Sequence, residues 1–308
     1  MDLSWAFDFT TLTVLAGAVI LGVVAGALGC FATLRKQSLL GDALAHAALP
    51  GICLGFLLSG ARQTVPLLAG AMAAGIVAVL MLLLITRGTR VKEDAALGIV
   101  LTVSFGIGAV LLTAIQHGSD GSQAGLDRFL FGQAATLLPR DVLVMALLGG
   151  VALAGLSLAF KEFALQTFDP AFAAAAGLPV TGLSVALGAM LAVAVAIGLQ
   201  AVGVILMVSL LIAPAVAARQ WTRSLGAMVV LAAAIGAGSA IAGVLASAAT
   251  DGMPTGPAIV LAATAAAVFS ILFAPGRGVI VTARRRARER RAWRSGGVPA
   301  RFAEGAGR

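Results

Sequence analysis

Two residues with metal-binding chemistry lie inside an otherwise apolar run. The stretch "SLLGDALAHAALPGICLGFLLSG" (38–60) is long and apolar enough to cross a membrane, yet it contains Asp42 and His46. His46 is one of only two histidines in 308 residues. At positions i and i+4, the two side chains lie on one face of a helix. A carboxylate and an imidazole together can bind zinc, manganese or iron(II).

Two ligands from one chain are too few for a tight structural metal site. They suit a transient site that is completed by water, by other spans or by a symmetry mate. A charged residue at bilayer depth costs about 2.5–3.5 kcal/mol on insertion scales, and such residues usually face a pathway or a partner. Cys53 falls within about 20° of the same face if the helix is straight, although Pro50 and Gly51 can kink it.

A second interpretation of the pair needs no metal. Asp42 follows Lys36 by only six residues, so a place near the membrane interface, where charge costs little, also explains it. His46 would then hydrogen-bond to a neighbouring helix. An isolated Asp-x-x-x-His motif does not decide between the two interpretations.

The composition predicts that these residues belong to a polytopic membrane protein. The chain is 60% hydrophobic and 11% charged, with a mean hydropathy of +1.04, whereas about 25% of a soluble protein is charged. Apolar runs of about 20 residues recur, and each can span a bilayer as a helix. The expected fold is all-α, a transmembrane bundle of eight or nine spans. The runs cover about 11–33, 39–60, 65–86, 95–116, 141–160, 181–199, 201–218, 225–248 and 257–275.

The number of spans depends on the run 181–218. It reads either as two spans that meet at Gln200, or as one span followed by a broken helix. Gln200 is a candidate pathway or gate residue, with a hydrogen bond between helices as the alternative role. Basic residues concentrate in alternate connections, which predicts that the N-terminus lies outside and the C-terminus in the cytoplasm.

Glycines within the spans predict close helix packing. The stretch "GVVAGALG" (22–29) contains Gly22 and Gly26 at a spacing of four, and "GAGSAIAG" (236–243) is similar. Small residues at this spacing let helices approach closely in lipid.

The formal charge of +8 comes from the C-terminal tail. Residues 277–308 contain ten arginines and two glutamates, and the rest of the chain is balanced. We therefore divide the chain into a transmembrane domain, 1–276, and an arginine-rich cytoplasmic tail, 277–308, that we expect to be disordered. Such a cluster beside a membrane span favours contact with anionic lipid over nucleic acid.

The segment "KEFALQTFDPAFAAAAGLPV" (161–180) contains the signals of a short capped helix. Asp169 suits the N-cap, Pro170 suits the first helical position, and Gly177 suits a left-handed exit. The pattern predicts a short helix over 170–176 on the cytoplasmic side. The alternative is an ordinary amphipathic connector.

Common catalytic motifs are missing from these 308 residues. The three lysines have no Walker A glycine pattern around them, and there is no HExxH motif. The chain is therefore not expected to hydrolyse ATP through a P-loop. A membrane enzyme is an alternative, but the lack of a second acid/base cluster argues against it. We expect a transport protein and not an enzyme, without a permanently bound cofactor. A secondary transporter driven by an ion gradient is the competing hypothesis.

Six blocks of the sequence together have the character of one protein family. The blocks are "RKQSLLGDALAHAALPGICLGF" (35–56), "KEDAALGIVLTVSFGIGAVLL" (92–112), "DRFLFGQ" (127–133), "KEFALQTFDPAFAAAAGLP" (161–179), "LQAVGVILMVSLLIAPAVAARQ" (199–220) and "TGPAIVLAATAAAVFSILFAP" (255–275). They resemble the membrane permease subunits of zinc/manganese/iron(II) ABC importers. They occur in the family's order and extend to about residue 275, and the arginine-rich tail lies outside them.

The resemblance implies a type II-like ABC importer permease in the bacterial cytoplasmic membrane. It implies a homodimer, a cytoplasmic ATPase subunit and an extracytoplasmic metal-binding protein, with the divalent metal ion as the transported substrate. Asp42 and His46 match the family's intramembrane metal-coordinating pair. The connector with Asp169, Pro170, Phe172 and Gly177 matches the segment expected to contact the ATPase.

Overall fold

The computed structural model describes residues 9–59, 64–117, 137–250, 252–275 and 278–283. Within these ranges the ordered elements are helices, and no strand occurs. The helices are α1 (Phe9–Leu34), α2 (Leu40–Ser59), α3 (Thr64–Gly88), α4 (Glu93–His117), α6 (Pro139–Leu158), α7 (Phe160–Phe168), α8 (Pro170–Ala175), α9 (Val180–Ala201), α10 (Val204–Trp221), α11 (Leu225–Ala249) and α12 (Thr255–Phe273).

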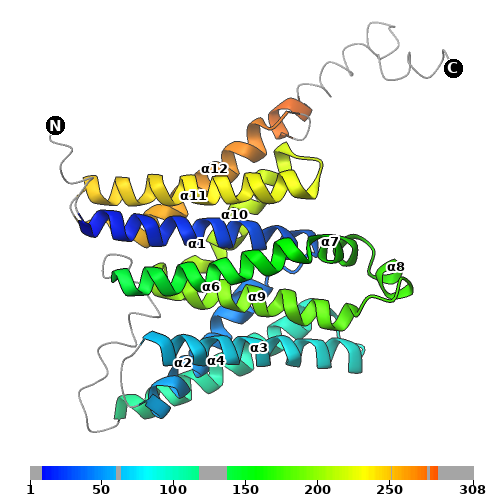
Figure 1. Ribbon diagram of the computed structural model, residues 1–308, viewed down its shortest axis with the longest axis horizontal. Coiled ribbons are helices and arrows are strands. Elements are labelled where there is room, and N and C mark those ends of the chain that lie inside the picture. Colours follow the sequence, from blue (N-terminus) through cyan, green and yellow to red (C-terminus); the bar gives the residue numbers. More distant parts are fainter. Residues whose placement is uncertain (1–8, 60–63, 118–136, 251, 276–277, 284–308) are drawn as a thin grey trace, which may run out of the picture.

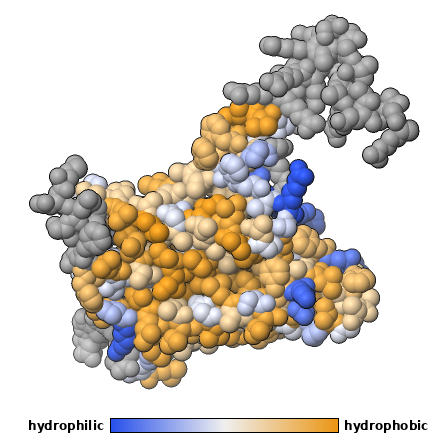
Figure 2. All heavy atoms as spheres, turned by 45° about the horizontal axis from the view of Figure 1, so that its top comes forward, coloured by the Kyte–Doolittle hydropathy of each residue, from blue (hydrophilic) through white to orange (hydrophobic). Residues whose placement is uncertain are grey.

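The long helices lie side by side in one bundle (Figure 1). In the described part of the chain, eight helices are long and apolar enough to cross a membrane, and α10 is a shorter apolar helix. Figure 2 shows one face of the bundle, on which hydrophobic residues cover most of the surface and hydrophilic residues gather near its margins. The predicted all-α transmembrane bundle is confirmed.

The ambiguous run 181–218 forms two separate helices. Helix α9 ends at Ala201 and α10 begins at Val204, so the break follows Gln200 by two residues. Gly203 has φ 83° and ψ 171° at this break, a backbone conformation that is essentially restricted to glycine. After the break, α10 packs against α1, α11 and α12. The first part of the run is therefore a candidate span, and the second is a shorter helix within the bundle.

The two glycine-rich stretches pack against each other. Helices α1 and α11 lie in contact along their length. A Cβ atom on Gly22 would meet the carbonyl oxygen of Gly236, and one on Gly26 would meet the carbonyl oxygen of Ala232. The predicted packing role of Gly22 and Gly26 is confirmed, because any larger residue would push the two backbones apart.

One end of the bundle carries the short helices. Helices α7 and α8 project beyond α6 and α9 at the right of Figure 1, and we call the segment 160–177 the connector. Phe31, near the end of α1, packs edge-on against Phe160 and Phe163 of α7, with ring centroids 6.1 and 6.3 Å apart. Residues 279–283 are helical, and the tail predicted to be disordered lies from Arg284 outside the described residues.

Candidate functional site: an aspartate–histidine pair on α2

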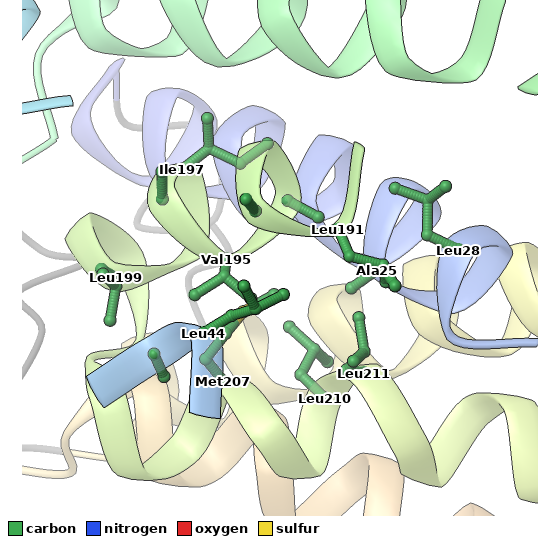
Figure 3. Packing of buried hydrophobic residues seen from close by; sticks show 14 of the residues in the cluster. Ala25, Leu28, Leu44, Leu191, Val195, Ile197, Leu199, Met207, Leu210 and Leu211 are labelled. Atoms are coloured by element: carbon green, nitrogen blue, oxygen red, sulfur yellow. The ribbon is translucent and has the colours of Figure 1, made fainter. Parts of the chain in front are cut away.

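One side of helix α2 faces the bundle core, and the candidate pair, Asp42 and His46, lies on a different side. Leu44 lies between Asp42 and His46 in sequence and points toward Val195 of α9 and Met207 of α10 in the core (Figure 3). From Leu40 to Cys53, every residue except Asp42 and His46 is buried. Packing of these apolar residues against neighbouring helices therefore sets the rotation of α2, and this rotation keeps the two polar side chains out of the core.

The distance between the two polar groups matches neighbouring ligands of one metal ion. His46 Nε2 lies 3.4 Å from Asp42 Oδ1, which is longer than a good hydrogen bond between nitrogen and oxygen. Ligands about 2.0–2.2 Å from a tetrahedral ion lie roughly 3.3–3.6 Å apart. The side chains are 27% and 34% exposed for His46 and Asp42 respectively, so an ion and further ligands can reach them.

Surrounding groups define the position of the pair. Asp42 is in the first turn of α2, where the positive end of the helix dipole stabilises a carboxylate. Phe105 of the adjacent helix α4 packs edge-on against the His46 imidazole, with ring centroids 5.2 Å apart. Sequence reasoning missed Phe105, because an aromatic residue in an apolar run has no signal that distinguishes it from a lipid-facing one.

The structure does not group Cys53 with the pair. Among the described residues, no cluster of three or more His, Cys, Asp or Glu side chains is placed to hold a metal. Cys53 is fully buried, with its Sγ 4.0 Å from the carbonyl oxygen of Gly108 on α4. Gln200 lies at the end of α9, and its buried Oε1 accepts no hydrogen bond from the described part of the chain. The roles of Cys53 and Gln200 in a pathway stay predictions.

The connector has the local structure that the sequence predicts. The backbone N–H of Phe172 donates to Asp169 Oδ1 at 2.9 Å, Pro170 begins α8, and Gly177 has φ 82°. The predicted N-cap and left-handed exit are therefore confirmed. The Phe168 and Phe172 side chains are 65% and 58% exposed, so two aromatic rings at this end of the bundle are accessible to a binding partner.

A model of the ABC 3 transport family matches residues 7–274. The chain belongs to this family. It is 49% identical over 278 residues to the manganese transport system membrane protein MntC of Bacillus subtilis (strain 168), a match that covers 90% of this chain and 64% of that relative. It is 46% identical over 281 residues to the zinc transport system membrane protein TroC of Treponema pallidum (strain Nichols), covering 91% and 94%.

The fold agrees with a solved structure, that of PsaBC from Streptococcus pneumoniae in complex with Fab. The TM-score is 0.78 at 31% sequence identity, and the match covers 89% of this chain and 96% of that one. The family resemblance identified from the sequence blocks is thus confirmed. The protein is a multi-pass membrane permease subunit of the ABC type, in the bacterial cytoplasmic membrane.

Proposed function

We propose that this chain is the membrane-spanning subunit of an ATP-driven importer for a divalent transition metal ion. Manganese, zinc and iron(II) are the candidate substrates, because manganese, zinc and iron appear in the names of its relatives. The observation that carries the proposal is the Asp42–His46 pair, whose donor atoms are 3.4 Å apart on an otherwise buried part of α2.

The pair has the chemistry of a transient site. One carboxylate and one imidazole leave most of the coordination positions of the ion to other ligands. A second copy of the chain would supply a second Asp42 and a second His46, and water would fill what remains. The ion is held as transported substrate, so a site that forms only when two copies meet suits binding followed by release.

ATP hydrolysis is assigned to a separate subunit. We infer that the exposed Phe172 on α8 enters a groove of a cytoplasmic ATPase, and that an extracytoplasmic binding protein delivers the ion at the opposite end. Lys161 lies in the connector itself, and Arg87 at the end of α3 donates to Thr181 Oγ1 at the start of α9, directly after the connector. These basic residues, with Arg90 in the turn between α3 and α4, support a cytoplasmic location for this end of the bundle. This orientation places the N-terminus outside and the C-terminus in the cytoplasm.

Reconstituted transport tests the proposal. The permease is inserted into proteoliposomes with its ATPase and metal-loaded binding protein, and ⁵⁴Mn²⁺ uptake is measured with and without ATP. We expect ATP-dependent uptake that Asp42→Ala and His46→Ala each abolish, while both variants still insert into the membrane at normal levels. Cys53→Ala is the comparison at a fully buried position, and it should lower uptake less than either of these variants.

Two results would contradict this function. Uptake that runs on an ion gradient without ATP would favour the secondary-transporter alternative. Normal uptake by Asp42→Ala or His46→Ala at limiting metal would show that the pair is not on the pathway.

A further inference from the structure

A chain of polar contacts joins the connector to the starts of the two helices around the candidate metal pair. It begins on α7, where Gln166 is 4% exposed. Gln166 Nε2 donates to Ser184 Oγ of α9 at 2.6 Å and to the carbonyl oxygen of Val180 at 3.0 Å. Because a buried amide is costly to leave without partners, α9 is expected to follow any displacement of α7 at this point.

The next contact reaches the turn between α1 and α2. Arg35 Nη2 donates to the same Ser184 Oγ at 3.4 Å, across 149 positions of sequence. Burial lowers the pKa of the Arg35 guanidinium below its usual value, and the negative charge of Glu93 offsets part of this lowering. Ser184 is itself 8% exposed, so one buried hydroxyl oxygen connects α7 with the turn that leads into α2.

The turn is held tightly enough to move with α2. Gln37 N–H donates to the carbonyl oxygen of Ala32 at 2.9 Å, and Leu40 N–H donates to the carbonyl oxygen of Gln37 at 3.0 Å. Gln37 Nε2 also donates to Glu93 Oε1 in the first turn of α4. The chain of contacts therefore ends at the start of α2, which carries Asp42 and His46, and at the start of α4, which carries Phe105.

The connector also carries polar atoms that are unsatisfied in the present arrangement. In the described part of the chain, Glu162 Oε2 and Gln166 Oε1 are buried on α7 without a hydrogen-bond partner, and Thr33 Oγ1 is in the same state in the last turn of α1. Buried polar atoms are normally paired, so a shift of α7 against α1 that gave these atoms partners would be favourable. A cavity of ≈ 40 Å³ borders Arg35, Gln37, Glu93 and Ser184 and leaves their side chains room to shift.

We propose that Gln166, Ser184 and Arg35 act as positioning residues that transmit a displacement of the connector to the first turns of α2 and α4. Gln37 and Glu93 complete the contact with α4. In this way a movement imposed by the ATPase changes the position of Asp42 and His46 and releases the ion. The inference rests on the proposed transport function and adds to it the route by which the two sites are coupled.

The test compares transport with ATP hydrolysis in the reconstituted complex, using ⁵⁴Mn²⁺ and the full-length chain. Ser184→Ala removes the shared acceptor and Gln166→Leu removes the donor. Each is expected to lower the metal delivered per ATP hydrolysed about fivefold or more, with Mn²⁺ binding to the isolated permease unchanged. The double variant should be no worse than the more affected single variant, because both act through one connection.

Matched variants separate this role from simple stability. Ser270→Ala in α12 removes a buried hydroxyl that donates to the carbonyl oxygen of Ala266 in its own helix, and it should keep the wild-type ratio. Ser184→Thr restores a hydroxyl and should recover coupling.

Three results would overturn the inference. Ser184→Ala could deliver as much metal per ATP as the wild type, or it could lower uptake and hydrolysis equally. The third is that the effects of Ser184→Ala and Gln166→Leu multiply in the double variant. ATP-independent uptake, or Mn²⁺ binding that survives Asp42→Ala and His46→Ala, would instead contradict the proposed function.

Discussion

At the scale of single residues, the position of Asp42 and His46 follows from the residues between them. Leu44 and its buried neighbours occupy the core side of α2, and the two polar side chains are left partly exposed beside α4. A metal ion that binds there depends on the orientation of the imidazole. Phe105 is the described side chain that packs edge-on against this ring.

We predict that Phe105→Leu weakens metal capture without abolishing transport. Leucine retains apolar bulk but loses an edge-on aromatic contact, which is worth about 0.5–1.5 kcal/mol. The half-saturating Mn²⁺ concentration for ATP-driven uptake should therefore rise roughly twofold to thirteenfold, with little change in the maximal rate. Phe269→Leu is the control, because it disrupts the Phe269–Phe273 contact within α12. Equal half-saturating concentrations for wild type and Phe105→Leu would show that the ring does not position His46.

At the scale of elements, the short helix α8 has an exposed aromatic residue and a fixed beginning. The hydrogen bond from the Phe172 N–H to Asp169 Oδ1 caps it, and Pro170 begins it with a suitable backbone angle.

We predict that Phe172→Glu uncouples ATP hydrolysis from metal uptake, because a charge at the docking ring must be desolvated at the ATPase surface. Co-purification of the ATPase and the ratio of uptake to hydrolysis measure the effect. Val91→Glu, at an exposed position between α3 and α4, is the control, and fully coupled transport by Phe172→Glu would exclude the docking role.

The break between α9 and α10 is the second element with a testable cause. Gly203 has φ 83° and ψ 171°, and a side chain in such a conformation costs about 1–3 kcal/mol. Gly203→Ala should therefore lower the thermal stability of the purified permease in detergent. Gly238→Ala in α11 provides the comparison, since an added Cβ there meets no atom within 4 Å. Similar melting temperatures for the two variants would mean that the backbone at Gly203 relaxes without strain.

At the scale of the whole molecule, the positive charge is concentrated at the C-terminal end of the sequence, in the tail that starts at residue 277. We predict that truncation after Thr282 lowers expression or weakens correct topology, because each basic residue near an anionic membrane surface contributes about 1 kcal/mol. Metal preference, measured by competition in uptake, should not change. Replacing the seven arginines of 284–294 with lysine should preserve insertion, and replacing them with glutamine should resemble the truncation. A truncated protein that inserts normally but prefers another ion would place the tail in the selectivity machinery.

The sequence by itself determined the features that depend on neighbouring residues along the chain. Apolar runs of about 20 residues predicted the long helices, and the i, i+4 spacing placed Asp42 and His46 on one face. The cap residues predicted α8, since N-cap and proline effects act within one turn. The resemblance in short blocks was sufficient to identify the family.

Only the tertiary structure decided which helices became neighbours. Gly22 meets Gly236, and Ser184 receives hydrogen bonds from both Arg35 and Gln166, yet no local pattern links these positions. Local sequence patterns do not distinguish one hydrophobic run from another as a packing partner, because each run can span lipid and few carry a polar group that specifies a partner. Three features depend on which helices become neighbours: the rotation of α2, the contact of Phe105 with His46, and the chain of polar contacts from the connector to the starts of α2 and α4. They had to be read from the packed bundle.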